Sequence, residues 1–167
     1  QQSERESDNP LWSEKLAETH ASNNEIFKAV EVLETFNQRH PDNHTILFNI
    51  AWYADGCGDY GKAIHFYKLC LEKNIEQPEE VYLKLAVIYT DHYLDKLTAL
   101  KHYREALSLS PGYKAGLFDY GGFLQKTGNY SAAKRTFESL LSSQEYKKRA
   151  LARLVEFPGD HQSADIA

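Results

Sequence analysis

The stretches "GNYSAAKRTF" (residues 128–137) and "GDYGKAIHFY" (residues 58–67) follow the same pattern. Each has a glycine, a small polar residue and a tyrosine, and then an alanine followed by an aromatic residue about one helical turn later. The alanine recurs at intervals of 34, 36 and 34 residues, as Ala29, Ala63, Ala99 and Ala133. A larger apolar residue stands about one turn beyond each of them, as Leu33, Tyr67, Tyr103 and Phe137. An internal period of this length is typical of solenoid proteins.

Each period reads as two helices joined by a tight turn. Asn9 is placed to cap the first helix, and Pro10 suits its first turn, where a missing N–H costs nothing. Gly58 predicts a turn residue with positive φ between the two helices of the second period. The alanine lies where the two helices cross, and its small side chain allows a close approach. Because one hairpin cannot bury its apolar face alone, we expect the hairpins to stack.

These residues resemble the tetratricopeptide repeat family over roughly four-fifths of the chain. Its motif is closest at Gly58-Asp59-Tyr60 with Ala63, and at Gly128-Asn129-Tyr130 with Ala133. The chain departs from the family's turn motif at Asn24-Glu25-Ile26 in the first unit, and Lys96 replaces the turn tyrosine in the third. In no unit does the first helix have the family's tryptophan. The resemblance implies an all-α fold: a right-handed α-solenoid of about four helix-turn-helix hairpins plus a C-terminal capping helix.

The predicted organisation has four parts. Residues 1–9 are expected to be a disordered N-terminal arm, and residues 158–167 a frayed tail. Four repeats occupy 10–143, with limits at 10–43, 44–78, 79–113 and 114–143. Residues 144–157 form the capping helix, which alternatively begins a fifth unit or leads into a further domain.

Composition excludes several classes of function. The net charge of −5 is uneven: residues 1–78 hold 7 basic and 13 acidic side chains, and residues 79–167 hold 12 and 11. A pI near 5.8 argues against nucleic acid as a partner, and no apolar run is long enough for a membrane span. The chain has no methionine, so we expect a processed form or a piece of a longer protein. Two cysteines and no secretory signal favour the cytoplasm, although a processed or secreted chain would look the same.

No motif in the sequence predicts an enzyme. There is no Gly-rich phosphate loop, no GxSxG and no HExxH. His40 and His44 lie across a proline-containing loop rather than on one helical face, so we expect neither a metal site nor a cofactor.

In tetratricopeptide repeat proteins the first helix of each unit lines a concave groove that accepts a peptide. The resemblance places eleven residues there: Glu14, Glu18, Phe48, Asn49, Trp52, Asp55, Lys84, Val87, Asp91, Phe118 and Asp119. Aromatic residues beside carboxylates suit a protein or peptide with apolar and basic residues. Trp52 is the favoured anchor, and the alternative is that Trp52, Phe48 and Phe118 only pack against neighbouring helices.

One subtype of the family does not fit. A co-chaperone clamp for a C-terminal carboxylate would use Asn49 and Lys84, but Glu14 and Glu18 stand where it needs Lys and Asn. We therefore expect a non-enzymatic protein–protein interaction module or scaffold. The alternatives are a repeat region of a larger enzyme, similar to those that precede bacterial sulfotransferase domains, and self-association through the terminal helix.

Overall fold

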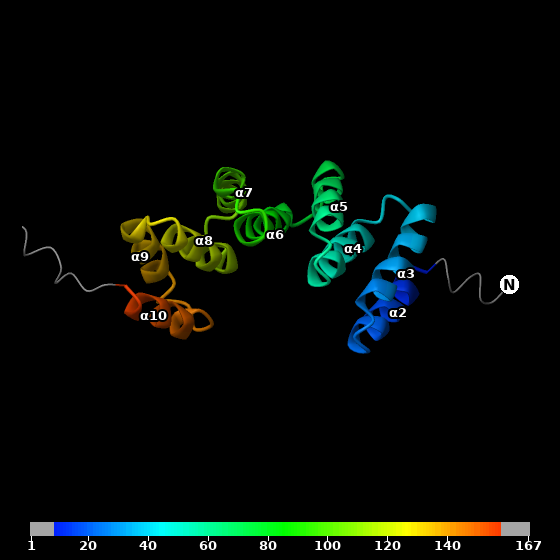
Figure 1. The fold of residues 1–167 in the computed structure, drawn as a ribbon, viewed down its shortest axis with the longest axis horizontal. Coiled ribbons are helices and arrows are strands. Elements are labelled where there is room, and N and C mark those ends of the chain that lie inside the picture. Colours follow the sequence, from blue (N-terminus) through cyan, green and yellow to red (C-terminus); the bar gives the residue numbers. More distant parts are fainter. Residues whose placement is uncertain (1–8, 158–167) are drawn as a thin grey trace, which may run out of the picture. The chain divides into compact units, whose positions relative to one another are not determined.

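The computed structural model describes residues 9–157, and every regular element in that range is an α-helix (Figure 1). The predicted N-terminal arm, apart from Asn9, and the predicted tail at 158–167 lie outside the described residues. The helices divide between two compact units with a boundary between Leu85 and Ala86, inside helix α6.

Unit 1 contains two helical hairpins and the first half of α6. Its helices are α2 (Pro10–Ser22), α3 (Ile26–Arg39), α4 (His44–Gly56), α5 (Tyr60–Glu72) and α6 (Pro78–Asp91). Helix α2 packs on α3 and α4 packs on α5, while α4 also packs on α3 of the preceding hairpin. This pattern of contacts within and between successive hairpins is that of a helical repeat.

Unit 2 contains the second half of α6 and four further helices. They are α7 (Lys96–Leu109), α8 (Lys114–Lys126), α9 (Tyr130–Ser139) and α10 (Lys147–Val155). Helix α8 packs on α9, and α9 packs on α10. Helix α10 lies within the range predicted for the capping helix, but it begins later because residues 140–146 form turns, in which the Tyr146 N–H donates to Ser143 Oγ (3.3 Å).

The helix starts follow from local side-chain chemistry. Asn9 accepts a hydrogen bond from the Leu11 N–H (3.0 Å), and Pro10 is the first residue of α2, as predicted. Asn43 caps α4 in the same way, accepting from the Ile46 N–H (3.0 Å).

The turns within the hairpins require a left-handed backbone residue. Gly58 has φ +83°, which confirms the prediction, and Gly128 has φ +82°. Asn24 takes this role in the first hairpin at φ +62°, and Leu94 takes it between α6 and α7 at φ +53°. An L-residue such as Leu94 accepts this conformation at a cost of roughly 1–2 kcal/mol.

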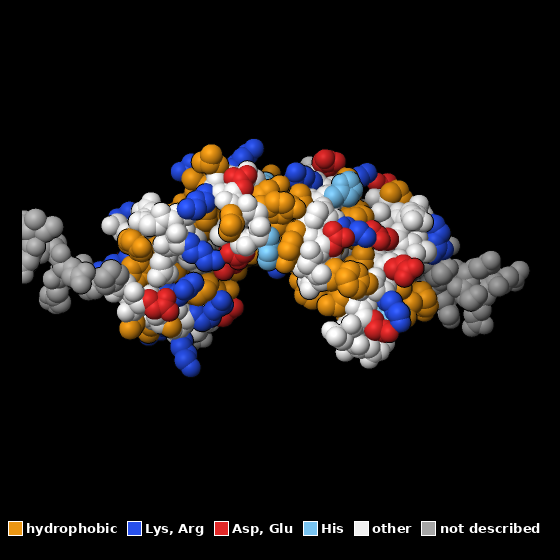
Figure 2. Space-filling model, in the orientation of Figure 1, with side chains coloured by type: hydrophobic (Ala, Val, Ile, Leu, Met, Phe, Trp, Pro, Cys, Tyr) orange, Lys and Arg blue, Asp and Glu red, His pale blue; other side chains and the backbone are white. Residues whose placement is uncertain are grey.

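The periodic alanines are all in the core. Ala29, Ala63, Ala99 and Ala133 are completely buried, and the larger residues about one turn later are buried too. The small side chain at each crossing thus permits the close helix packing expected from the sequence. Hydrophobic side chains also reach the surface of both units, with charged side chains among them (Figure 2).

Candidate functional site

The most open aromatic residue of the predicted groove is Trp52. Its side chain stands on α4 and is 48% exposed. It lines a hollow of about 250 Å³ in unit 1, here called the Trp52 hollow, together with Ala21, Ile26, Tyr53, Asp55 and Gly56. Trp52 and Asp55, two residues predicted for the groove, therefore share one small surface site.

Phe48 lies on the same helix but in a different setting. Its ring packs edge-on against buried Tyr67, with 5.7 Å between ring centroids. Its open side faces a second hollow of unit 1, of about 530 Å³. The other residues around this hollow come from the loops before α4 and α6 and from the starts of those helices: Asp42, Asn43, His44, Thr45, Ile75, Glu76, Gln77 and Glu80. Phe48 is half-buried, and it both packs on Tyr67 and lines this hollow, so its role in binding or in helix packing stays a prediction.

Tyr67 is the largest fully buried side chain of unit 1. Its hydroxyl has no hydrogen-bond partner among the described residues. Burial, and secondarily the negative charges of Asp55 and Glu80, raise its pKa well above the usual range. Tyr67 therefore stays neutral and serves as packing between α4 and α5.

Unit 2 brings together four residues predicted for the groove. Val87, Asp91, Phe118 and Asp119 line one hollow of about 230 Å³, here called the unit 2 hollow. Lys126 also lines it and pairs with Asp91 through a 2.6 Å contact between Nζ and Oδ1.

Two arginines of α10 complete this surface, and the sequence analysis did not assign them to the site. The guanidinium of Arg149 lies 4.2 Å from the centre of the Phe118 ring, a cation–π contact. Arg153 lines the unit 2 hollow and lies against Gly122. A Cβ atom added to Gly122 would stand 3.3 Å from Nη2 of Arg153. Lys and Arg side chains gather over α10 (Figure 2). Since α10 follows the last predicted repeat, only packing against α8 and α9 could place these arginines here.

The remaining predicted residues line none of these hollows. Glu14, Asn49 and Lys84 are half-buried. Glu18 is exposed, and its carboxylate pairs with Lys15 (2.8 Å). Burial raises the pKa of Tyr53, and the negative charge of Glu18 raises it further. Glu18 therefore interacts electrostatically with the residue next to Trp52.

The other tryptophan, Trp12, was not predicted as a surface feature. It is 40% exposed and lines a hollow on the α2–α3 hairpin, the Trp12 hollow, with His20, Lys28 and Arg39 among its other lining residues. This tryptophan thus sits among basic side chains, whereas Trp52 sits beside a carboxylate.

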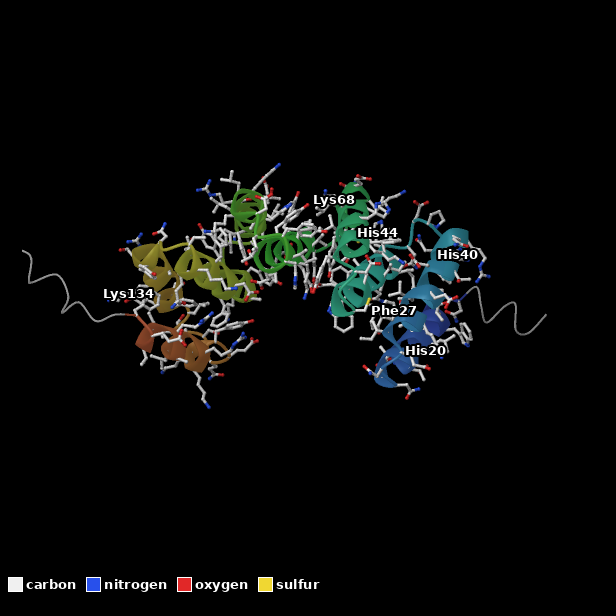
Figure 3. All side chains as sticks on the ribbon, in the orientation of Figure 1. His20, Phe27, His40, His44, Lys68 and Lys134 are labelled. Carbon is white, nitrogen blue, oxygen red and sulfur yellow. The ribbon has the colours of Figure 1, made fainter. Side chains whose placement is uncertain are left out.

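Three of the histidines lie at or near helix ends. His40 packs its ring on Phe36 (centroids 4.5 Å apart) at the end of α3, and His44 begins α4 (Figure 3). His20 Nδ1 lies 2.8 Å from the Glu25 carboxylate. Within residues 9–157, no three His, Cys, Asp or Glu side chains are grouped in a way that could hold a metal ion. No helix in the same range has the length and apolar character needed to cross a membrane.

Solved structures similar to this chain define the class of protein. MamA has a TM-score of 0.71 at 20% identity, covering 85% of this chain and 82% of its own. YrrB, described as a TPR protein with an unusual peptide-binding site, has a TM-score of 0.69 at 15% identity, covering 90% and 77%. A tetratricopeptide repeat protein from Parabacteroides merdae has a TM-score of 0.71 at 20% identity, covering 83% of this chain and 54% of its own. These similarities show an all-α helical-repeat fold.

One segment of the sequence matches a family profile. Residues 44–72, which form α4 and α5, match the profile of the tetratricopeptide repeat. This match and the fold of the solved neighbours support the predicted resemblance to the tetratricopeptide repeat family. No curated protein matches the chain significantly.

Proposed function

We propose that this chain is a non-enzymatic interaction module that binds a peptide or protein segment along the first helices of its hairpins. The observation that carries the proposal is Trp52, a large aromatic side chain that α4 holds 48% exposed in a small hollow beside Asp55. Exposed aromatic residues in pockets are frequent anchors of protein interfaces. We assign no catalytic role to any side chain.

The similarity to YrrB supports the same class of function. Its description as a TPR protein with an unusual peptide-binding site shows that this fold can bind a peptide.

The charges of the two units suggest the chemistry of the partner. Asp55 is the one charged residue among the described residues that line the Trp52 hollow, and the charge of Glu18 contributes to the raised pKa of Tyr53. The unit 2 hollow contains both signs of charge, because Lys126 and Arg153 stand there with the carboxylates. We therefore propose that unit 1 binds a partner with apolar and basic residues. For unit 2 we propose a partner surface that carries both acidic and basic residues.

A peptide-display selection tests the proposal. Peptides selected against the wild-type chain are measured for binding to Trp52→Ala and to Trp12→Ala, which removes an equally large side chain from the basic hollow of the same unit. We expect Trp52→Ala to weaken binding and Trp12→Ala to leave it nearly unchanged. Equal binding by all three proteins would remove Trp52 from the site and overturn the proposal.

Self-association through α10, a scaffolding role and a cytoplasmic location stay predictions. Sedimentation velocity tests the first of them directly, because a monomer at micromolar concentration would contradict it.

A further inference from the structure

The Trp52 hollow has the features of a site for a single side chain. It belongs entirely to unit 1, where α4 provides Trp52, Tyr53, Asp55 and Gly56 and the α2–α3 hairpin provides Ala21 and Ile26. A volume of about 250 Å³ is too small for a helix or a folded segment, but it can hold one long side chain. The inference below rests on the proposed function, since it names the group that the peptide would insert.

Two aromatic rings form one corner of the hollow. The centroids of the Trp52 and Tyr53 rings are 5.0 Å apart, and the ring planes meet at 60°. Nearly half of the Trp52 side chain is open to solvent. An indole surface that remains accessible in this way can attract a cation through its π electrons, and tryptophan does so better than tyrosine or phenylalanine.

The charges around the corner favour the same kind of ligand. Asp55 lines the hollow, and none of its lining residues is Lys, Arg or His. Glu18, on α2, does not line the hollow and pairs with Lys15 (2.8 Å), but its charge contributes to the raised pKa of the neighbouring Tyr53. The Trp12 hollow of the same unit is lined instead by His20, Lys28, Arg39 and one carboxylate, Glu31. The two tryptophans thus offer similar rings, one beside a carboxylate with no basic residue among its described lining residues and the other in a hollow lined by side chains of both signs.

We propose that the Trp52 hollow binds the guanidinium group of an arginine side chain in the peptide partner. The planar guanidinium would stack on the Trp52 ring while its N–H groups donate to the Asp55 carboxylate. Arginine fits better than lysine because it is planar, is more weakly hydrated and presents donors in a fork that matches a carboxylate. A lysine ammonium would keep its charge but would lose the stacking and the paired donors.

A small probe tests this inference without a known partner. N-acetyl-arginine methylamide and its citrulline counterpart, which has nearly the same shape without the charge, are titrated into the full chain. The indole N–H signals of Trp52 and Trp12 are followed by NMR. We expect arginine to shift the Trp52 signal with an affinity at least about tenfold higher than that of citrulline, and to leave the Trp12 signal nearly unmoved.

A lysine analogue and one protein variant provide two further tests of the preference for arginine. Lysine should bind more weakly than arginine, and Asp55→Asn should reduce the preference for arginine over citrulline. Because Asp55 has other interactions in the structure, the melting temperature of the variant is measured alongside. Equal binding of arginine and citrulline by the wild type, or equal shifts at both tryptophans, would overturn the inference even if the variant proved unstable.

The selected peptides separate this inference from the proposed function. Each arginine of a peptide that depends on Trp52 is replaced by citrulline. If binding falls at one position, the arginine site is supported. If no replacement matters although Trp52→Ala still abolishes binding, the module binds peptides but the arginine site is wrong. If no peptide depends on Trp52, the proposed function fails, and the probe titration still decides whether the hollow binds arginine.

Discussion

Cys70 and Cys57 differ in chemical accessibility although both are free thiols. Cys70 is completely buried on α5, and burial raises its pKa to about 11. Cys57 is half-buried at the end of α4, where its thiol donates a hydrogen bond to the Ala54 carbonyl (Sγ–O distance 3.3 Å).

These settings predict different reactivity towards thiol reagents. At pH 8 roughly a thousandth of a thiol with the pKa of Cys70 is ionised, and its burial slows the reagent further. We expect the folded chain to show one fast thiol, Cys57, and a second only on denaturation. Mass spectrometry after timed alkylation identifies the labelled residue, and labelling of Cys70 should grow as the pH rises towards 11. Rapid labelling of Cys70 at pH 8 would contradict its place in the core.

Asp95 is the residue that caps α7. Its side chain accepts a hydrogen bond from the Thr98 N–H (3.1 Å), and hydrogen bonds from Thr98 lower its pKa below the usual value of 3.8. Because the folded pKa is lowered, this stabilisation is present above pH 3.8 and is lost as the pH falls through the folded value.

We therefore expect Asp95→Ala to lower the melting temperature at pH 7 and to differ less and less from the wild type as the pH falls below 3.8. Asp95→Asn is the matched control, because asparagine keeps a capping oxygen, and it should lose less stability at pH 7. A difference between Asp95→Ala and wild type that does not change with pH would show that the carboxylate charge is unimportant.

At the scale of the elements, the packing of α8 on α9 depends on a glycine. A Cβ placed on Gly121 would stand 2.9 Å from the ring of Phe137, which is completely buried. Glycine is therefore needed here for close approach of the two helices, despite its weak helix propensity.

Gly121→Ala should destabilise the chain. We expect a loss of about 1–3 kcal/mol from overpacking, which exceeds the gain of roughly 0.5–1 kcal/mol in helix propensity. Urea denaturation measures the change. Gly61→Ala is the control, because Gly61 is exposed on α5 and the nearest atom to its Cβ would be 3.9 Å away. Equal stability of the two variants would show that α8 and α9 pack differently.

Elements with a strong local signal could be predicted from the sequence. Three features each depend on neighbours close in the chain: the helix cap at Asn9, the turn at Gly58 and the regular spacing of the buried alanines that begins at Ala29. The turn at Leu94 could not be predicted, because leucine in a left-handed conformation has no local signature and is held there by the helices on either side.

At the scale of the whole molecule, the two units present different surfaces for binding. Unit 1 has an aromatic hollow beside a carboxylate, and unit 2 has a hollow lined by Asp91, Asp119, Lys126 and Arg153, in which Lys126 pairs with Asp91. The sequence could place Trp52 and Asp55 close together because both stand on α4 at helical spacing, while their role in binding stays a prediction. It could not predict Arg149 or Arg153, because their position depends on how α10 packs against the preceding hairpin.

The measurement that tests the account most directly is the affinity of a selected peptide for three proteins: wild type, Trp52→Ala and Trp12→Ala. We expect Trp52→Ala to raise the dissociation constant about 30-fold, equivalent to about 2 kcal/mol, and Trp12→Ala to change it less than about twofold. The melting temperatures of both variants should stay close to that of the wild type. Unchanged affinity of Trp52→Ala, or a loss of binding matched by a loss of stability, would contradict the claim that Trp52 is the anchor of a peptide-binding site.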